Sequence, residues 1–289
     1  MIDITLVTSI AARALDEDLA PLQEALDALG LRTEIAAWEE PFNYAQTRLA
    51  VLRSPWNYTE CFAQFDQWLS ATSDCTTLLN PAEVVRFSLD KHYLGVLQAR
   101  GVPIIPSRFI ECGQTPEFNE LDEFVVKPCI GAGSRGARRF AGGEFSSAAQ
   151  HAENLLAQGM SVLVQPYLKA VDHSGETALI FFDGEYSHAI RKSALLDHSG
   201  TPFSGLFKPE SITARDAQAD EIEVATLALN ALQLAEPLTY ARVDLIRASD
   251  GSPQLLELEL AEPSVFLSYA PASAKRFAET LKRRLIHAN

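Results

Sequence analysis

Hydrophobic and polar positions alternate along the first 80 residues in the order expected of a small parallel sheet. The apolar run at 2–7 predicts a strand, and leucines three or four apart from Leu19 to Leu29 predict a helix that ends at Gly30. The further elements predicted here are strands at 31–38, 48–54 and 76–80 and a helix at 58–71. Strands that alternate with helices favour an open α/β unit.

The pattern changes after residue 80. One helix is predicted from Pro81 to Gly101, because proline suits a first helical turn and glycine suits a helix end. The elements predicted next are strands at 104–110, 123–128, 137–141 and 161–168 and a helix at 146–159. A glycine-rich loop joins the second and third of these strands.

The last third of the chain reads as an antiparallel arrangement. Residues 176–192 form a predicted hairpin that turns at Asp183-Gly184. Thr213 and Asp216 have the spacing of a capping box for the next helix. Two more strands, at 240–248 and 253–262, and a basic C-terminal helix follow. The second half is therefore expected to be a mixed, largely antiparallel α+β structure.

Length and composition narrow the class of protein. With 289 residues, 47% of them hydrophobic, the chain can build two or three units of roughly 100–200 residues with buried cores. A net charge of −14 argues against nucleic acid or an acidic membrane as a partner, since either would need clustered Lys and Arg. No apolar run approaches the ~20 residues of a membrane span, and the N-terminus does not resemble a leader, so we expect a cytoplasmic protein.

Cysteine and histidine positions indicate no metal centre. The four cysteines, at 61, 75, 112 and 129, match no disulfide or metal-ligand spacing, and we expect reduced thiols in the core. The six histidines are dispersed along the chain, which also favours ordinary packing or surface roles.

The segment LLELELAEPS, residues 255–264, raises the question of why a buried strand would carry carboxylates. Two-residue periodicity places Glu257 and Glu259 on one face and Leu256, Leu258 and Leu260 on the other. One interpretation is an edge strand with a wet outer face. The other is that the acidic face binds cations, because buried carboxylates need a metal or a positive partner.

The glycine-rich loop VVKPCIGAGSRG has GxGxxG spacing, which alone is a weak signal. A nicotinamide site needs this loop to begin a helix, whereas here a strand follows, and the P-loop pattern and the kinase motifs are missing. A loop between two strands can instead cover a triphosphate with its backbone N–H groups, and Lys127 just before it can reach phosphate oxygens.

Together these motifs resemble the ATP-grasp superfamily of carboxylate-amine ligases. The resemblance covers about 80–289 and depends on the order of the motifs, which are DKHYL, VVKP, GAGSRG, VLVQPYL, HAIRK, ARVDL and LLELELAEPS. It implies an ATP-grasp fold, with an open α/β domain at 1–84 and two α+β subdomains, at 85–168 and 169–289, that sandwich ATP.

The resemblance also implies roles for individual residues. ATP would be contacted by Lys91, Lys127, Gly131, Gly133, Ser134, Gly136, Gln165, Tyr167, Leu168 and Glu176. Arg191 or Lys192, with Arg242, would neutralise the transferred phosphate.

Asp244, Glu257 and Glu259 would hold one or two Mg²⁺ ions, which prefer carboxylates and phosphates. This would explain the acidic strand. Where the family commonly has Glu-x-Asn, this chain has Glu257-x-Glu259, which leaves the ligand set open. Glu262, past the strand, is expected to be a loop acid.

The chemistry implied is attack of a substrate carboxylate on the γ-phosphate, followed by displacement of phosphate from the acyl phosphate by a nitrogen nucleophile. No side-chain nucleophile is needed. Because water would destroy an acyl phosphate, we expect a cover formed by the glycine loop and by 193–209, with Lys208 among the substrate contacts.

In the first domain, the segment RSPWNY follows a strand where open sheets place ligands. We expect Arg53, Ser54, Trp56 and Tyr58 to contact an amino-acid-like substrate, although Trp56 fits interdomain packing equally well. This segment, NPAEVVRFSLDKHYL and LELELAEPS together resemble the branch that includes the D-cycloserine-forming cyclo-ligase, which acts on O-ureido-D-serine.

Three alternatives stay open: a ligase that joins two separate amino acids, a kinase that phosphorylates a stable acceptor, and a non-catalytic ATP or ADP sensor. The family resemblance also makes a homodimer plausible.

Overall fold

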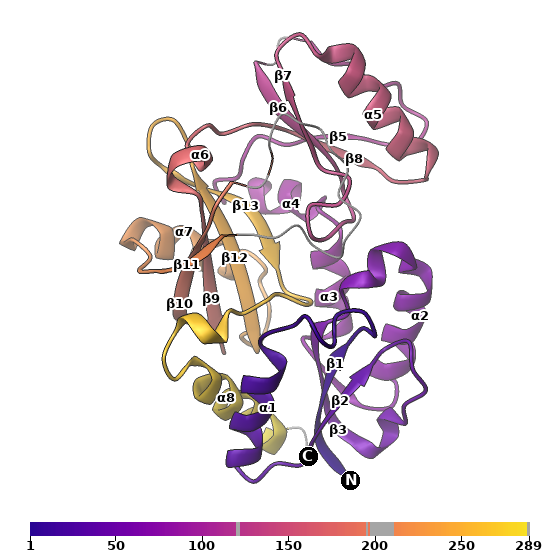
Figure 1. The fold of residues 1–289 in the computed structure, drawn as a ribbon, viewed down its shortest axis with the longest axis vertical. Helices are drawn as coiled ribbons and strands as arrows, with labels where there is room; N and C mark the ends of the chain where they lie inside the picture. Colours follow the sequence, from indigo (N-terminus) through magenta and orange to yellow (C-terminus); the bar gives the residue numbers. More distant parts are fainter. Residues whose placement is uncertain (120–121, 195, 197–210, 288–289) are drawn as a thin grey trace.

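The computed structural model describes residues 1–119, 122–194, 196 and 211–287, and it arranges them as three sheets along the long axis of the molecule (Figure 1). Each sheet lies within one of the three ranges predicted as domains, although the domain boundaries themselves stay a prediction. Within the described part, no helix is both long and apolar enough to cross a membrane. Lys208 and most of the expected cover at 193–209 lie outside the described residues.

The first sheet has the order β2-β1-β3-β4 and is parallel throughout, as predicted. Its strands are β1 (Ile2–Thr8), β2 (Thr33–Ala37), β3 (Thr47–Ser54) and β4 (Thr77–Leu79). Its helices are α1 (Leu19–Ala28) and α2 (Phe62–Ser73), with short 3₁₀ turns η1 (Tyr44–Gln46) and η2 (Trp56–Glu60). Leu19, Leu22 and Leu26 are buried because they share one face of α1, and Gly30 ends this segment at a φ of 75°.

The upper sheet has the order β5-β8-β6-β7 and is antiparallel. It consists of β5 (Arg108–Ile110), β6 (Glu123–Pro128), β7 (Arg138–Ala141) and β8 (Val162–Pro166). Helix α5 (Phe145–Ala157) covers one face, where its Ala148 and Ala152 pack against Phe124 and Phe140. The other face of this sheet looks toward the central sheet (Figure 1).

The central sheet has the order β11-β10-β9-β12-β13 and is also antiparallel. Its strands are β9 (Glu176–Phe182), β10 (Glu185–Lys192), β11 (Ile212–Arg215), β12 (Tyr240–Arg247) and β13 (Pro253–Glu259). The remaining helices of this part are α6 (Val171–Ser174), α7 (Ala219–Asn230), α8 (Ser273–His287) and the turn η3 (Leu267–Tyr269).

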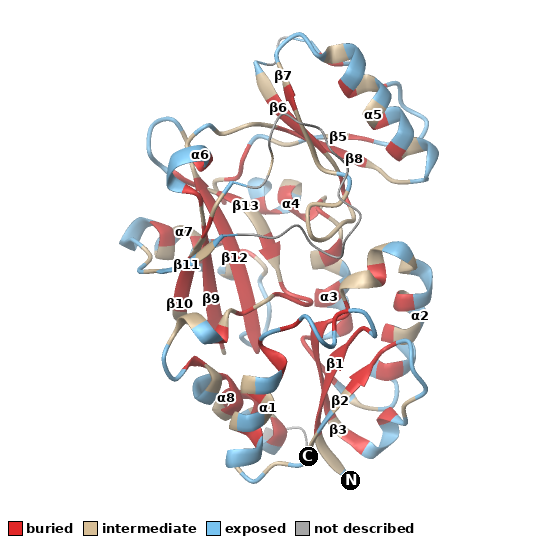
Figure 2. Cartoon of the chain, in the orientation of Figure 1, coloured by how far each residue is buried: buried red, intermediate tan, exposed pale blue. Residues whose placement is uncertain are grey.

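Both faces of the central sheet are covered, because β9 is apolar on both sides. Leu179 and Phe181 pack with α7 and with a helix of the second subdomain, whereas Ile180 and Phe182 pack with α1 and α8. The burial map in Figure 2 shows this strand and β12 as continuous buried stretches between the two helical layers.

The helix predicted from Pro81 to Gly101 is in fact two helices, α3 (Ala82–Leu89) and α4 (Tyr93–Ala99). The chain leaves the helical path at Asp90, which forms a β-bridge with Ile130, and the Lys91 N–H donates to the Cys129 carbonyl. Periodicity alone could not reveal this break, since the competing contacts come from Cys129 and Ile130, just after β6 and far along the chain.

The predicted capping box at Thr213 and Asp216 is wrong. Thr213 lies in β11, and α7 begins later with a reciprocal box between Gln218 and Glu221. Gln218 does not fit the Ser/Thr pattern used for the prediction, and the pairing of β11 with β10 keeps Thr213 and its neighbours in a strand.

One buried side chain ties the first sheet to the central one. Asn80, just after β4, donates to the carbonyls of Tyr240 and Leu260 at 2.9 and 2.7 Å and accepts from Thr239 N–H at 3.0 Å. These bonds hold the end of the parallel sheet against the strands that carry the acidic motif.

Candidate active site

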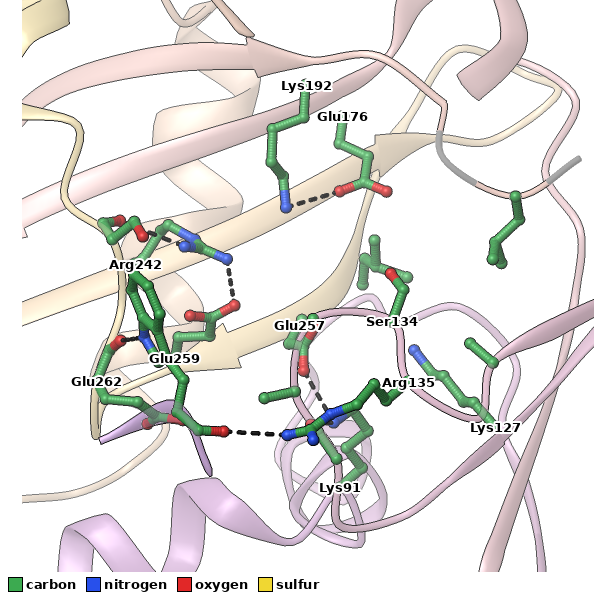
Figure 3. A pocket seen from close by; sticks show the side chains of 18 of the residues that line it. Lys91, Lys127, Ser134, Arg135, Glu176, Lys192, Arg242, Glu257, Glu259 and Glu262 are labelled. Atoms are coloured by element: carbon green, nitrogen blue, oxygen red, sulfur yellow. Dashed lines mark hydrogen bonds and ion pairs between the residues drawn. The ribbon is translucent and has the colours of Figure 1, made fainter. Parts of the chain in front are cut away.

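A cavity of about 510 Å³ lies where the three sheets meet. Figure 3 shows cationic and acidic side chains of the second and third parts converging on it. Its walls include most of the predicted site residues, namely Trp56, Tyr58, Lys91, Lys127, Gly131, Gly133, Ser134, Gln165, Tyr167, Leu168, Glu176, Lys192, Arg242, Glu257 and Glu259. Arg53, Ser54, Gly136, Arg191 and Asp244 do not line it.

Lys91 joins the glycine loop to the acidic strand. Its Nζ donates to the Gly131 carbonyl at 2.9 Å and lies 2.9 Å from the Glu257 carboxylate. Burial by itself would lower the pKa of Lys91, but the charge of Glu257 and its hydrogen bond outweigh burial and raise the pKa. Lys91 is therefore a fixed ammonium at the cavity wall.

Lys127 has a different environment. Burial is the largest influence and lowers the pKa of this ammonium. The charge of Glu257 opposes burial, and the charge of Lys91 lowers the pKa further. An ammonium whose charge is poorly compensated is a ready binding group for an anion, because an anion restores the lost electrostatic stabilisation. Together with Lys91 it forms a cationic wall suited to phosphate oxygens.

The glycine loop joins β6 to β7, as predicted. Gly133 has φ of 60° and the next residue, Ser134, has φ of 61°, so backbone N–H groups rather than side chains dominate this turn. Gly136 lies away from the cavity, which corrects its predicted ATP contact. Its φ is 71°, and a Cβ there would come within 3.1 Å of the Pro128 ring, so it shapes the loop from behind.

The hinge after β8 carries the residues expected to meet adenine. Gln165 is buried and donates from Nε2 to Ser107 Oγ at 3.0 Å. Tyr167 lies beneath the guanidinium of Arg139, whose Cζ is 3.4 Å from the ring centroid. Tyr167, held by this contact, and Leu168 line the cavity and offer an aromatic and an apolar surface of the kind that suits a nucleobase.

The acidic hairpin has the predicted arrangement, with one deviation. Arg242 pairs with Glu259 and Asp244 with Glu257 across β12 and β13, so all four share a face. A β-bulge between Asp244 and Leu245 changes the register, and Leu256 therefore lines the cavity instead of facing the opposite side.

Asp244 lies behind the cavity wall and is fully buried. Its carboxylate accepts from Lys192 Nζ at 2.6 Å and from Arg242 Nε at 2.9 Å. Arg242 also pairs with Glu259, and Lys192 lies 2.9 Å from Glu176 (Figure 3). These pairs form one network that fixes both cations at the cavity.

The structure places Arg191 outside the site. Because neighbouring residues of β10 point to opposite faces, only Lys192 reaches the cavity. Arg191 donates instead to the carbonyls of Ser174 and His173, each at 2.6 Å. It secures α6 to the sheet, and its assignment to the transferred phosphate is corrected.

The predicted substrate contacts of Arg53 and Ser54 also need correction, because neither residue lines the cavity. Arg53 is fully buried and donates to the Pro263 carbonyl at 2.8 Å, while Ser54 hydrogen-bonds Thr8 at 2.7 Å. Sequence position after a strand suggested ligand contact, but these side chains point into the domain contact. Arg53 instead supports the loop that follows β13.

That loop is held by the first domain from several sides. Asp18 accepts from the N–H groups of Val265 at 2.7 Å and Leu267 at 2.7 Å, and Trp56 Nε1 donates to the Glu262 carbonyl at 3.0 Å. Trp56 therefore serves domain packing and lines the cavity as well. Its own carbonyl accepts from Arg135 of the glycine loop at 3.2 Å.

Three cavity residues were missed from the sequence. Glu262, expected to be a loop acid, is 8% exposed and lines the cavity beside Tyr58. Asp16 is equally buried, and its Oδ2 has no hydrogen-bond partner among the described residues. Arg135 of the loop reaches Glu60 and Thr59 of the first domain. Periodicity could not identify them, because all three lie in irregular segments.

Burial raises the pKa of Glu262 to about 7, although Tyr58 and Lys91 oppose the change. A raised carboxyl pKa contributes stability that is present below the unfolded value of 4.5 and is lost as pH rises through about 7. We expect Glu262→Gln, without ligands, to increase the free energy of unfolding by up to about 3 kcal/mol at pH 8 and by little at pH 4.5.

Urea denaturation at the two pH values measures this difference, with exposed Glu185→Gln as the matched control. An equal effect of Glu262→Gln at both pH values would contradict the assigned pKa.

The donor groups fit a hard divalent cation such as Mg²⁺. Glu257 and Glu259 are cavity carboxylates next to Lys91 and Lys127. Burial opposes ionisation of Glu257, but Lys91 and Lys127 together lower its pKa to about 2, so it is charged at neutral pH. Burial raises the pKa of Glu259 to about 8, and a nearby cation would reverse that rise. Asp244 could join only by releasing Lys192 or Arg242.

Comparison with known proteins agrees with this geometry. A family model described as D-cycloserine synthetase DcsG, N-terminal domain, matches residues 4–80. The chain is 40% identical over 296 residues to the cycloserine biosynthesis protein DcsG of Streptomyces lavendulae, with 98% of each protein covered.

Among solved structures, the crystal structure of D-cycloserine synthetase DcsG is similar with a TM-score of 0.91 and 40% identity, over 98% of this chain and 99% of that one. The D-alanine–D-alanine ligase of Bacillus anthracis has a TM-score of 0.71 at 16% identity, over 99% and 98%, and therefore shares the fold. The ATP-grasp resemblance and the narrower one are both confirmed.

Proposed function

Because the chain belongs to the D-cycloserine synthetase family and is an ATP-dependent ligase of the ATP-grasp fold, we propose that it cyclises O-ureido-D-serine, or a close amino-acid-like carboxylate, to D-cycloserine. The observation that supports this best is one cavity that brings together a lysine wall, the carboxylates Glu257 and Glu259, and two further buried acids, Asp16 and Glu262. Such a cavity can bind ATP, a metal and a small zwitterionic acid side by side.

The lysine wall would receive the phosphates. Lys91 and Lys127 approach from two segments, and the glycine loop between β6 and β7 would cover the phosphates with N–H groups. Glu257 and Glu259 would hold Mg²⁺, with Asp244 as a third candidate. When bound, the ion neutralises phosphate charge and aligns the γ-phosphate for in-line transfer.

Lys192 and Arg242 would stabilise the transferred phosphoryl group and the acyl phosphate. Both are held in place before ligand arrives, Lys192 between Glu176 and Asp244 and Arg242 between Asp244 and Glu259. Preorganised cations lower the barrier because they need little reorganisation as charge develops. The substrate carboxylate attacks the γ-phosphorus and ADP leaves; the oxygen-bound substrate nitrogen then attacks the acyl carbon and phosphate leaves. With O-ureido-D-serine this nitrogen still carries a carbamoyl group, which water must remove as carbon dioxide and ammonia to give D-cycloserine.

The two further buried acids, Asp16 and Glu262, would recognise the amino group of the substrate. The unpaired Oδ2 of Asp16 and the carboxyl of Glu262 are both buried cavity groups, and an ammonium would offset their desolvation. Tyr58, hydrogen-bonded to Glu262, would keep that carboxyl oriented.

The glycine loop would also exclude water. Arg135 already connects it to Trp56, Thr59 and Glu60 of the first domain. These bonds close the cavity on the side where an acyl phosphate would otherwise meet solvent.

The test is product analysis with Mg²⁺, ATP and a panel of amino-acid-like acids. We expect ADP, phosphate and D-cycloserine with O-ureido-D-serine. A stable phosphorylated compound would instead indicate a kinase, a dipeptide would indicate a two-substrate ligase, and tight ATP binding without turnover across the panel would indicate a sensor.

The amino-group assignment makes a separate prediction. Asp16→Asn should raise KM for the amino acid about 10–100-fold and leave KM for ATP within a factor of two, since a charged hydrogen bond contributes about 1.5–3 kcal/mol. Steady-state kinetics measures both constants, with Glu24→Gln, an exposed position that does not line the cavity, as control. Equal changes in the two KM values would contradict a role at the amino group.

A further inference from the structure

Outside the cavity, four side chains with metal-binding atoms gather behind the two phosphate-facing lysines. One oxygen of Asp90, one ring nitrogen of His92 and Sγ of Cys129 lie within 4.8 Å of one another. Glu111 adds a second carboxylate, with Oε1 2.9 Å from His92 Nε2. The sequence indicated no such centre, because Asp90 and His92 are 37 or more residues from Cys129 in the chain.

The imidazole of His92 is already oriented as in known metal sites. Its Nδ1 lies 2.6 Å from Asp90 Oδ1, and its ring stacks on Phe109 with centroids 4.4 Å apart. Metal-binding histidines usually donate one ring N–H to a carboxylate, which directs the other nitrogen to the ion. Here that arrangement leaves Nε2 facing Glu111 and, at 4.0 Å, the thiol of Cys129.

These distances suit one small ion. Zinc bonds of about 2.3 Å to sulfur and 2.0 Å to nitrogen at a tetrahedral angle place the two donors about 3.5 Å apart. The 4.0 Å between Cys129 Sγ and His92 Nε2 is about 0.5 Å longer, so a small side-chain movement closes the site around the ion. One thiolate, one imidazole and one carboxylate form a donor set that favours Zn²⁺ or Co²⁺ over the harder Mg²⁺.

We propose that Asp90, His92 and Cys129, the three residues whose donor atoms lie within 4.8 Å of one another, bind a transition-metal divalent cation, with Glu111 as a nearby carboxylate that contacts His92 Nε2. The site is distinct from the Mg²⁺ site proposed in the cavity, since its four residues do not line that cavity. On binding, the Cys129 thiol releases its proton to solvent, whereas His92 binds as the neutral imidazole, whose Nδ1–H is directed at Asp90. Burial raises the pKa of Cys129 to about 12, so the ion must supply the energy for this release.

The ion would brace both phosphate-facing lysines. Lys91 lies between Asp90 and His92 in the chain, and its N–H donates to the Cys129 carbonyl at 3.0 Å. Cys129 is also two residues after Lys127, and its own N–H donates to the Ser161 carbonyl at 2.8 Å. An ion that joins His92 to Cys129 therefore fixes the segments that carry Lys91 and Lys127 relative to each other.

Cobalt spectroscopy tests the site. The full-length protein is titrated with Co²⁺ under reducing conditions in excess Mg²⁺, which keeps the cavity carboxylates occupied. We expect one equivalent to produce a thiolate-to-cobalt charge-transfer band. That band should vanish in Cys129→Ser, and Asp90→Asn should weaken affinity about 10–100-fold. Exposed Cys75→Ser is the matched thiol control.

Because Cys129 is buried and its substitution could impair folding, His92→Gln provides a second variant at a partly exposed position. We expect at least tenfold weaker Co²⁺ binding in it. No charge-transfer band in the wild type, or the same band and affinity in His92→Gln, would overturn the proposal. Calorimetry of ATP binding with and without Zn²⁺ tests the brace: a change of at least threefold is expected in the wild type and none in Cys129→Ser.

Discussion

Glu257→Gln should reduce kcat by roughly 10³-fold, because it removes an ionised ligand from the proposed Mg²⁺ site and the ion-pair partner of Lys91. Glutamine keeps the size of the side chain, and Lys91 retains its bond to the Gly131 carbonyl at 2.9 Å. The fold should therefore persist, with an unchanged circular dichroism spectrum. The loss should be in the chemical step, since metal-assisted charge neutralisation is needed most in the transition state.

Turnover is measured as ADP release at saturating ATP and Mg²⁺. Glu185→Gln, exposed at the hairpin after β9, is the matched control and should match the wild type. Activity of Glu257→Gln within tenfold of the wild type would show that this carboxylate does not hold the metal.

Lys127→Met should have opposite effects on ligand binding and on stability. Loss of one charged phosphate contact should lower kcat/KM for ATP roughly 100-fold. The free energy of unfolding should stay the same or increase, because the variant no longer buries an ammonium whose pKa is lowered by desolvation. Most substitutions of buried residues destabilise a protein, so this sign is diagnostic.

A lowered lysine pKa also predicts the pH dependence. The folded state loses its proton before the unfolded state does, so wild-type stability should gain as pH rises toward 10.5, and Lys127→Met should lack that gain. Denaturation curves at neutral and alkaline pH measure this, with exposed Lys275→Met as control. A clear loss of stability in Lys127→Met at neutral pH would contradict an uncompensated ammonium.

The pattern of hydrophobic and polar residues was sufficient to predict the strands and the faces of their side chains wherever buried and exposed positions alternate regularly. The parallel first sheet, the hairpin at Asp183-Gly184 and the pairing of Asp244 with Glu257 all follow from alternation and turn residues. The same reasoning failed at Thr213 and at the helix break at Asp90, where hydrogen bonds from distant strands overrode the local pattern.

For the site, the sequence identified the charged residues but could not always predict which of their side chains face the cavity. Alternation shows that Arg191 and Lys192 face opposite ways, yet only the pairing of β10 decides that Lys192 faces the cavity. Arg53 has the chemistry of a carboxylate binder, but a contact 210 residues away, with Pro263, makes it a structural residue.

The sequence by itself determined the ATP-grasp order of motifs, the two lysines that line the cavity and the acidic strand, because each depends on neighbours in the chain or on strand periodicity. Only the tertiary structure showed that Asp16 and Glu262 line the cavity and that His92 and Asp90 lie close to Cys129. The physical reason is the same in both cases: these groups lie in irregular segments whose mutual approach depends on how the sheets pack, and burial then gives ordinary side chains their unusual charge environments.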